Sequence, residues 1–287
     1  MTAAVFDLHT HTCASDGLLS PRELIALARR HGLTGIAVTD HDTVNGLDEA
    51  LAAGEEEGYP VVPGVELTTD YGRFEVHILA YFIDYRHPEL CARLAEVAQG
   101  RLRRAEEMVA KINALGYPLR WEEVKAKANG PFIGRSHLVR TLVETGVIPP
   151  EKAGDFFRTY LVPGTAAYVP HQDLPTEEAV RVALAAGGVP VLAHPGRMGN
   201  PALIPELIAL GMVGLEVDYP LHSARETAFY RQLVNEYGLI STGGSDFHGD
   251  GAGPCLGQAV CGAESVLALA RRARSENAQV FLAKMHI

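Results

Sequence analysis

The chain has 287 residues, and its 25 lysines and arginines against 35 aspartates and glutamates give a formal net charge of −10. Apolar residues make up 47% and charged residues 21%, which allows a large core and excludes a disordered chain. Because an acidic protein is repelled by phosphate backbones and anionic lipids, we expect neither duplex DNA nor a membrane as a partner. The first residues lack the pattern of a secretory leader and no CxxC pair occurs, so we expect a cytoplasmic protein with reduced thiols.

Strand and helix patterns alternate over the first 84 residues. Short runs rich in β-branched and apolar residues predict strands over residues 3–9, 35–39, 61–69 and 74–83. Ser20, Pro21 and Glu23 form a capping box with proline at the first helical position, which predicts a helix that ends at Gly32. A second helix is predicted over residues 44–57.

The pattern becomes helical and densely charged after residue 84. Helices are predicted over residues 88–115, 121–128, 134–145 and 151–160, and no strand pattern interrupts them. We therefore predict a helical insertion over residues 85–164, within a main domain formed by residues 1–84 and 165–287. Since the insertion leaves after the fourth predicted strand and returns before the fifth, we expect it to cap one face of that domain.

Alternation resumes after the insertion. Strands are predicted over residues 189–194, 214–218 and 239–245, and helices over residues 176–186, 223–237 and 263–275. Thr176 is the expected N-cap of the first of these helices. Repeated βα units indicate an α/β fold with a parallel sheet, either open or closed into a barrel.

Histidines and acids gather where the predicted strands end. Residues two apart on a strand point to the same side, and the carboxyl ends of parallel strands share one face of the fold. We therefore expect one cavity to be lined by nine side chains, namely His9, His11, Asp16, His41, Glu66, His77, His194, Asp246 and His248.

Six imidazoles and three carboxylates exceed what one metal ion requires. Mixed nitrogen and oxygen ligation without cysteine suits manganese, zinc or iron in an open site. We expect two or three divalent ions, with manganese first and zinc or iron as alternatives. Such ions clamp phosphoryl groups, and they supply the local positive charge that an acidic chain lacks.

These motifs resemble those of the PHP (polymerase and histidinol phosphatase) family of phosphoesterases. The resemblance covers both ends of the chain and implies a distorted (β/α)7 barrel with a trinuclear metal centre. It is carried by His9-Thr10-His11-Thr12 through Ser15-Asp16-Gly17, by Thr39-Asp40-His41-Asp42, by Pro63-Gly64-Val65-Glu66 with Val76-His77, and by Ala193-His194-Pro195 with Gly244-Ser245-Asp246-Phe247-His248.

The resemblance also implies how nine ligands divide among three ions. It implies a first ion held by His9, His11, Glu66 and Asp246. Glu66 would bridge to a second ion held by His77 and His194, and a third ion would be held by Asp16, His41 and His248. Asp40 and Asp42 are expected to orient imidazoles.

Gly134-Arg135-Ser136-His137 resembles the Gly-Arg-Pro-His element of one subgroup of this family, with serine in place of the usual proline. The stretch from Glu216 to His222 also resembles that subgroup. Its members include a nucleoside 3′,5′-bisphosphate phosphatase and a 5′-to-3′ exoribonuclease on short RNA. The resemblance implies hydrolysis of phosphate monoesters of small nucleotides, above all the 3′-phosphate of nucleoside 3′,5′-bisphosphates, by a hydroxide that bridges two ions.

Substrate phosphates require cationic donors that the acidic ligands cannot supply. Arg135, His137, Arg197 and His222 are the predicted substrate contacts, and Arg135 and His222 are also predicted to act in catalysis. Arg101, Arg103 and Arg104 are interpreted as a solvated helix face. The oligomeric state is left open.

Five functions remain in view at this point. Besides the bisphosphate phosphatase, the chain could be an exoribonuclease on short 5′-phosphorylated RNA, a histidinol-phosphate phosphatase, an amidohydrolase-type metal hydrolase or a non-catalytic, metal-stabilised binding module. Asp246-x-His248 and Thr39-Asp40-His41-Asp42 favour phosphoesterase chemistry over amide hydrolysis. The complete ligand set favours an enzyme over a binding module.

Overall fold

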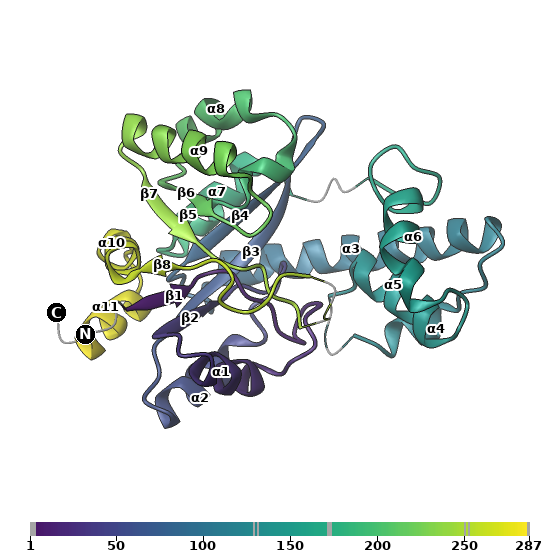
Figure 1. The fold of residues 1–287 in the computed structure, drawn as a ribbon, viewed down its shortest axis with the longest axis horizontal. Helices are drawn as coiled ribbons and strands as arrows, with labels where there is room; N and C mark the ends of the chain where they lie inside the picture. Colours follow the sequence, from purple (N-terminus) through teal and green to yellow (C-terminus); the bar gives the residue numbers. More distant parts are fainter. Residues whose placement is uncertain are drawn as a thin grey trace.

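The computed structural model describes residues 4–128, 130, 132–170, 174–249, 251 and 253–285. An eight-stranded sheet with the order β7-β6-β5-β4-β3-β2-β1-β8 forms its centre (Figure 1). The strands are β1 (Val5–Asp7), β2 (Gly35–Val38), β3 (Val61–Tyr71), β4 (Phe74–Tyr81), β5 (Val189–Leu192), β6 (Gly214–Asp218), β7 (Ile240–Gly243) and β8 (Cys261–Gly262). Each predicted strand is present, although Ala3 lies outside the described residues, and β8 was not predicted.

The sheet is mixed, so the prediction of a parallel sheet is wrong at two strands. Strand β4 is antiparallel to both of its neighbours, β3 and β5, and β8 is antiparallel to β1. The cause is the connection between β3 and β4, a tight turn at Gly72, whose φ is +62°. A turn this short joins only antiparallel strands, since a parallel pair needs a crossover of a dozen or more residues.

Hydrogen bonds between the two ends of the chain close the sheet into a distorted barrel, as the resemblance implies. The amide of Leu8 donates to the carbonyl of Gly243 at 3.1 Å, and the amide of Asp246 donates to the carbonyl of His9 at 2.8 Å. A Cβ on Gly244 would lie 2.4 Å from the Cβ of His9, so the closure needs glycine there.

Helices cover the outside of the barrel. They are α1 (Pro21–Arg30), α2 (Leu47–Glu56), α7 (Thr176–Ala185), α8 (Ile204–Ala209), α9 (Ala224–Tyr237), α10 (Ala263–Arg272) and α11 (Glu276–Lys284). The capping box of Ser20 and Glu23 is present at α1, as predicted. The prediction for Thr176 is wrong, because Pro175 is the N-cap and the Thr176 hydroxyl pairs with that of Thr69 at 2.8 Å. Helices α8 and α11 were not predicted.

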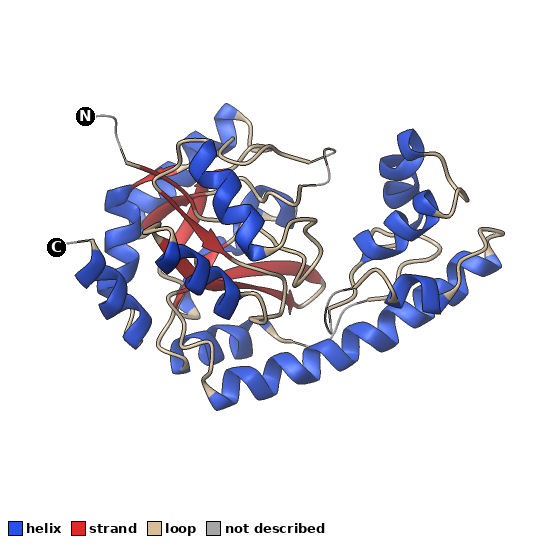
Figure 2. Cartoon of the chain, turned by 90° about the horizontal axis from the view of Figure 1, so that it is seen from below, coloured by secondary structure: helices blue, strands red, loops and turns tan. Residues whose placement is uncertain are grey.

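The stretch between β4 and α7 is helical, as predicted. It contains α3 (Pro88–Ala114), α4 (Trp121–Lys125), α5 (Arg135–Glu144) and α6 (Ala153–Tyr160), and its described residues include no strand. Helix α3 runs from beneath the barrel out to the other helices (Figure 2). Its first half packs into the barrel core through Leu90 and Val97, whereas Met108 and Ile112 belong to a separate apolar cluster of the insertion. The division into a main domain and a subdomain over residues 85–164 stays a prediction.

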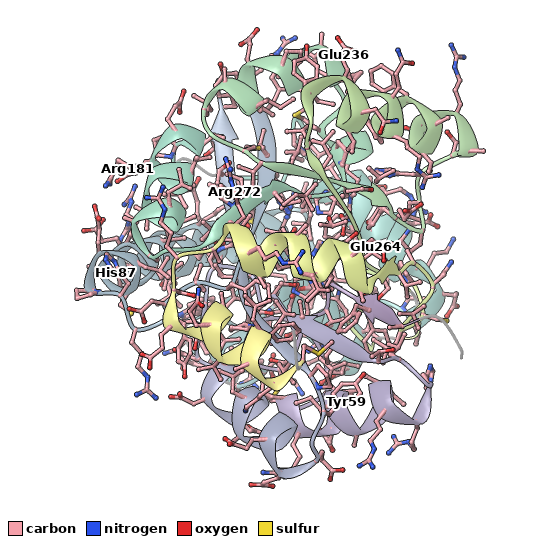
Figure 3. The ribbon with its side chains drawn as sticks, turned by 90° about the vertical axis from the view of Figure 1, so that its left-hand side faces the viewer. Tyr59, His87, Arg181, Glu236, Glu264 and Arg272 are labelled. Atoms are coloured by element: carbon pink, nitrogen blue, oxygen red, sulfur yellow. The ribbon has the colours of Figure 1, made fainter. Side chains whose placement is uncertain are left out.

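Helices α10 and α11 pack at the end of the barrel opposite the insertion (Figures 1 and 3). Phe281 of α11 meets Phe82, which follows β4, with ring centroids 5.1 Å apart. Because α10 and α11 cover that end, the end of the barrel that faces the insertion is the one left open for a site.

No described helix is both long and apolar enough to span a bilayer.

Candidate metal centre

The nine predicted ligands come together at the barrel end that faces the insertion. His9 and His11 follow β1, and Asp246 and His248 follow β7, so the closure of the barrel joins the two pairs. His41 follows β2, and its backbone pairs with that of Glu66, within β3, in an isolated parallel β-bridge. His77 lies within β4, His194 follows β5, and Asp16 lies in the loop between β1 and α1.

Glu66 is the centre of this cluster and is fully buried. Its Oε2 lies 2.9 Å from Nδ1 of His41, 3.2 Å from Nε2 of His9 and 3.3 Å from Nε2 of His11. Its Oε1 lies 2.7 Å from Nδ1 of His77 and 2.9 Å from Nε2 of His194. One carboxylate therefore faces five imidazoles from four strands, which suits a bridging ligand.

Eight of the nine predicted ligands fall into three groups that could each hold a metal ion, and His194 belongs to none of them. The groups are His9, His11, Glu66 and Asp246; His11, Asp16, His41 and His248; and His41, Glu66 and His77. The first equals the ligand set that the resemblance implies for the first ion, and the second contains the set for the third ion. The ligand roles themselves stay a prediction.

Unpartnered polar atoms in the cluster fit bound cations. Buried atoms without a hydrogen-bond partner among the described residues include Nε2 of His9, both ring nitrogens of His11, Nδ1 of His41, Oδ1 of Asp16 and Oε2 of Glu66. Buried polar atoms are normally satisfied, because leaving one unpaired costs roughly 1–3 kcal/mol. Their concentration on imidazoles and carboxylates is what a site for divalent ions requires.

Two candidate ligands have a backbone conformation that non-glycine residues rarely adopt. The φ angle is +24° at His194 and +58° at Asp246. Such conformations cost on the order of 1–3 kcal/mol each and persist where the surroundings enforce them. His194 lies two residues after β5 and Asp246 three residues after β7, and both side chains contact the cluster.

Without ions, the acids and imidazoles of the cluster stabilise each other's charged forms. Burial lowers the pKa of His9, but the carboxylates of Glu216, Glu66 and Asp246 outweigh burial and raise that pKa well above its ordinary value. Burial raises the pKa of Glu66, but His41, His9 and His77 hold it well below its usual range. The ion-free cluster therefore retains protons on imidazoles that a metal ion would displace.

Glu216 belongs to the site, although the sequence indicated no role for it. Its Oε1 lies 3.0 Å from Nδ1 of His9, and its Oε2 accepts a 2.7 Å hydrogen bond from the amide of His194. It is fully buried in the middle of β6. Glu216 thereby orients the imidazole of His9 and leaves Nε2 for a metal ion. Its position inside a buried strand, like that of Glu66 within β3, was the available signal.

We expect Glu216→Gln to weaken metal binding by about tenfold to a hundredfold, because an amide lacks the charge that holds His9 in one tautomer. Titration of the metal-free protein with Mn²⁺ measures this change. Glu236→Gln is the matched control, since Glu236 is exposed on α9 (Figure 3). Equal metal affinity in wild type and Glu216→Gln would contradict the role given to Glu216.

The expected roles of Asp40 and Asp42 are wrong, since neither contacts an imidazole through a hydrogen bond or ion pair among the described residues. Asp40 accepts hydrogen bonds from the amide and hydroxyl of Thr12, both at 2.7 Å, and from Ser15. Asp42 instead pairs with Arg101 of α3. Both acids therefore hold the surrounding chain segments in place rather than the ligands.

The interpretation of the α3 arginines as a solvated face is also wrong for two of them. Arg101 and Arg104 are 5% and 8% exposed, whereas Arg103 is exposed. Arg101 lies over the ring of Phe132, and Arg104 donates from Nε to the carbonyl of Val169 at 2.7 Å. A charged helix pattern could not reveal this, because burial depends on how the insertion packs against the barrel.

A cavity of about 690 Å³ lies between the cluster and the insertion. Asp16, His41, His77 and His248 line its metal side. Cations from both parts of the chain surround it, namely Arg101, Arg104, Arg135, Arg140 and Arg197. Arg135 pairs with Glu75 at 3.1 Å, and Glu75 lies 3.3 Å from Nε2 of His77.

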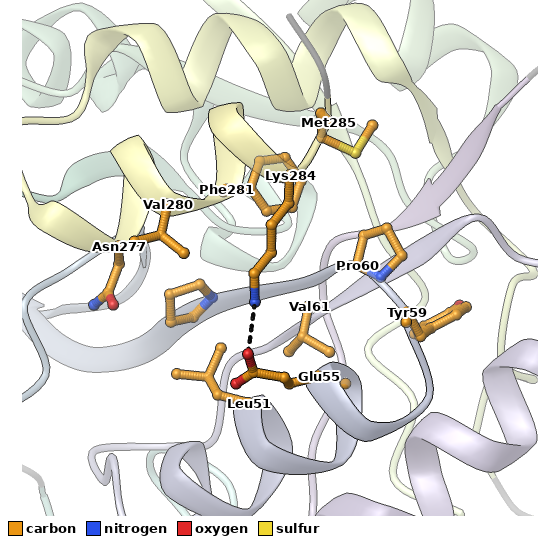
Figure 4. A pocket seen from close by; sticks show the side chains of 13 residues that line it. Leu51, Glu55, Tyr59, Pro60, Val61, Asn277, Val280, Phe281, Lys284 and Met285 are labelled. Carbon is orange, nitrogen blue, oxygen red and sulfur yellow. Dashed lines mark ion pairs between the residues drawn. The ribbon is translucent and has the colours of Figure 1, made fainter.

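A second cavity of about 600 Å³, between α2 and α11, is lined by none of the nine candidate ligands (Figure 4).

The predicted substrate contacts differ in their surroundings. Arg197 lines the cavity and donates to Tyr219 at 3.1 Å and to Asp246 at 3.3 Å. His222 is held by backbone groups at both nitrogens, since Nδ1 lies 3.0 Å from the carbonyl of Val217 and Nε2 accepts from the amide of Gly196. The substrate roles of Arg135, Arg197 and His222 stay predictions.

His137 is buried and is absent from the described lining of the cavity, so its observed contact is structural. Its Nδ1 accepts a 3.2 Å hydrogen bond from the amide of Gly134 and caps α5. Burial lowers the pKa of His137 to about 4 from an ordinary 6.5. Substrate contact by His137 stays a prediction, but its side chain already completes a helix cap.

The buried imidazole of His137 predicts a loss of stability in acid. The unfolded chain takes up a proton near pH 6.5 and the folded chain only near pH 4, so stability present above pH 6.5 falls as the pH is lowered. Between about pH 7.5 and pH 5, wild type should lose about 2 kcal/mol more than His137→Gln, which retains a capping acceptor. Urea unfolding at both pH values measures this difference, and equal losses would contradict it.

Comparisons with known proteins agree with this geometry. The family model described as PHP domain matches residues 7–119. The chain is 39% identical to a 3′,5′-nucleoside bisphosphate phosphatase from Chromobacterium violaceum, over 87% of this chain and 89% of that protein. It is 35% identical to a 5′-3′ exoribonuclease from Haemophilus influenzae, over 85% and 89% of the two chains. A structure named for a metal-dependent phosphoesterase from Bifidobacterium adolescentis superposes with a TM-score of 0.88 at 33% identity, covering 94% and 97%.

Proposed function

This chain belongs to the PHP family and is a metal-dependent phosphoesterase, and we propose that it removes the 3′-phosphate from nucleoside 3′,5′-bisphosphates. Three divalent ions, with Mn²⁺ as the first candidate, would be held by the nine ligands as the resemblance divides them. When bound, the ions would lower the pKa of a water molecule and neutralise charge on the phosphoryl oxygens.

The observation that carries the proposal is the cavity between the ligand cluster and the four arginines of the insertion. A nucleoside bisphosphate presents two phosphates, and the cavity offers two regions for them: the ligand cluster on one side and the arginines of the insertion on the other. Because α5 and α6 close one wall, the volume of about 690 Å³ suits a small ligand rather than an internal stretch of duplex.

Arg104 supports a phosphate on the insertion side. Its buried Nη2 has no hydrogen-bond partner among the described residues. Burial, together with the neighbouring cations Arg135 and Arg101, lowers the pKa of Arg104 to about 10. A buried, crowded guanidinium with an unused donor is a suitable group for a phosphate that is bound but not hydrolysed.

Arg197 supports the phosphate on the cluster side. Tyr219 and Asp246 hold one of its terminal nitrogens, and 56% of its side chain stays exposed. The remaining donors of the fork are free to bind phosphoryl oxygens with two parallel hydrogen bonds. Arg197 would thus orient the reacting phosphate against the ligand cluster.

A substrate comparison tests the proposal. Protein loaded with Mn²⁺ is assayed with nucleoside 3′,5′-bisphosphates, short 5′-phosphorylated RNA and histidinol phosphate, and inorganic phosphate and mononucleotides are measured separately. Release of phosphate from the 3′ position of bisphosphates, with a kcat/KM well above that for histidinol phosphate, supports the proposal. Hydrolysis of histidinol phosphate in preference to bisphosphates contradicts it.

The second candidate is a 5′-to-3′ exoribonuclease on short RNA. The 35% identity to the H. influenzae exoribonuclease favours it. The first nucleotide of a 5′-phosphorylated RNA carries phosphorus at the same two positions as a bisphosphate, with a phosphodiester in place of the 3′-phosphate. Stepwise release of mononucleotides from 5′-phosphorylated RNA, faster than phosphate release from bisphosphates, would make this the main activity.

A further inference from the structure

Asp16 differs from most of the candidate ligands in being placed by a loop rather than by a strand. It lies between β1 and α1, in a segment that Asp40 holds through Thr12 and Ser15. The side chain is 11% exposed and faces His248, whose Nε2 lies 3.3 Å from Oδ1. Hydrogen bonds within this loop reach the backbone near Asp16, but they do not set the rotation of its carboxylate.

Helix α5 of the insertion makes two contacts with Asp16. The hydroxyl of Ser136 donates to Oδ2 at 2.8 Å. One turn later, Nη2 of Arg140 donates to the main-chain carbonyl of Asp16 at 2.7 Å. The side chain and the backbone of Asp16 are therefore both held from the first two turns of a helix that follows it by 120 residues.

The two carboxylate oxygens of Asp16 have different surroundings. Oδ2 is taken by Ser136, whereas Oδ1 is buried without a hydrogen-bond partner among the described residues and faces the group with His11, His41 and His248. Because Oδ2 accepts the hydrogen bond from Ser136, the carboxylate cannot rotate freely and Oδ1 keeps one orientation. The carboxylate then binds a cation through one atom, at lower entropic cost than a freely rotating group.

We propose that Ser136 is a positioning residue that fixes Asp16 Oδ1 toward the third ion and thereby makes docking of the insertion part of that metal site. This inference rests on the proposed metal centre but not on the identity of the substrate. The insertion then does more than wall the cavity: the occupancy of one ion depends on α5 lying against the barrel. The Ser136 hydroxyl is the contact that joins α5 to the carboxylate of Asp16.

Metal titration of three proteins tests this role. Metal-free wild type, Ser136→Ala and Ser136→Thr are titrated with Mn²⁺ by calorimetry, and the bound ions are counted by elemental analysis. We expect Ser136→Ala to bind one of three ions about tenfold less tightly, with the other two unchanged, and Ser136→Thr to restore the affinity. Thr165→Val is the matched control. It also removes a hydroxyl between β4 and α7, but this hydroxyl donates to the carbonyl of Val162.

The outcomes separate this inference from the proposed function. Equal affinity for all ions in wild type and Ser136→Ala overturns it, as does a wild type that binds fewer than three ions or a failure of Ser136→Thr to restore binding. Thermal unfolding of the metal-free proteins checks that Ser136→Ala folds as wild type does. A preference for another substrate contradicts the bisphosphate proposal and leaves the metal titration unaffected.

Discussion

Glu66→Gln is expected to lower kcat/KM by on the order of a thousandfold and to lower the number of bound ions. Glu66 faces the imidazoles of five residues, and both of its oxygens lie within 3.3 Å of ring nitrogens. An amide of the same shape removes the negative charge that two of the three ligand groups share. It also turns one acceptor into a donor against imidazoles.

Steady-state assays and elemental analysis of the same preparations measure this effect. Glu55→Gln is the matched control, since Glu55 lies at the opposite end of the barrel, 3.8 Å from Lys284 (Figure 4). It should leave activity and metal content unchanged. A Glu66→Gln enzyme with wild-type turnover and full metal content would exclude Glu66 as a bridging ligand.

Removal of the metal ions should lower hydrolysis strongly and leave a folded protein that takes up protons. In the ion-free cluster, acids raise the pKa of His9 and imidazoles hold the pKa of Glu66 and Asp246 below their usual range, with burial opposing each shift. Because bound ions need neutral imidazoles, metal binding at neutral pH should release protons. Chelation should lower activity on the order of a thousandfold.

Calorimetric titration with Mn²⁺ in two buffers of different ionisation enthalpy measures the released protons. Activity should return with Mn²⁺, but not with Mg²⁺, which prefers oxygen ligands to a site with six imidazoles. Full hydrolysis by protein shown to be free of metal would contradict the metal centre. An apparent binding enthalpy that is the same in both buffers would contradict the protonated ion-free cluster.

Local patterns predicted the elements well, because caps and periodicity act over a few residues. Ser20 and Glu23 begin α1 as expected, and Ser223 and Glu226 form a second capping box at α9. Thr176 shows the limit of such signals: the residue type suits an N-cap, but its hydroxyl pairs with Thr69 across the fold. The direction of strands within the sheet was not predicted correctly either. The composition of β4 is that of a strand in either direction, and only its short turn from β3 makes it antiparallel.

Most of the site was readable from the chain because parallel strands end on one face, so the imidazoles and acids that follow β1, β2, β5 and β7 had to become neighbours. Glu66 and His77 lie within β3 and β4, and the pairing of these two strands brings them to the same face. Which of the ligands share an ion, and which groups orient them, followed only from the closed barrel and the docked insertion. Glu216 lies 207 residues from His9, and Ser136 lies 120 residues from Asp16. Contacts over such separations depend on how whole elements pack, and no local spacing of residues encodes them.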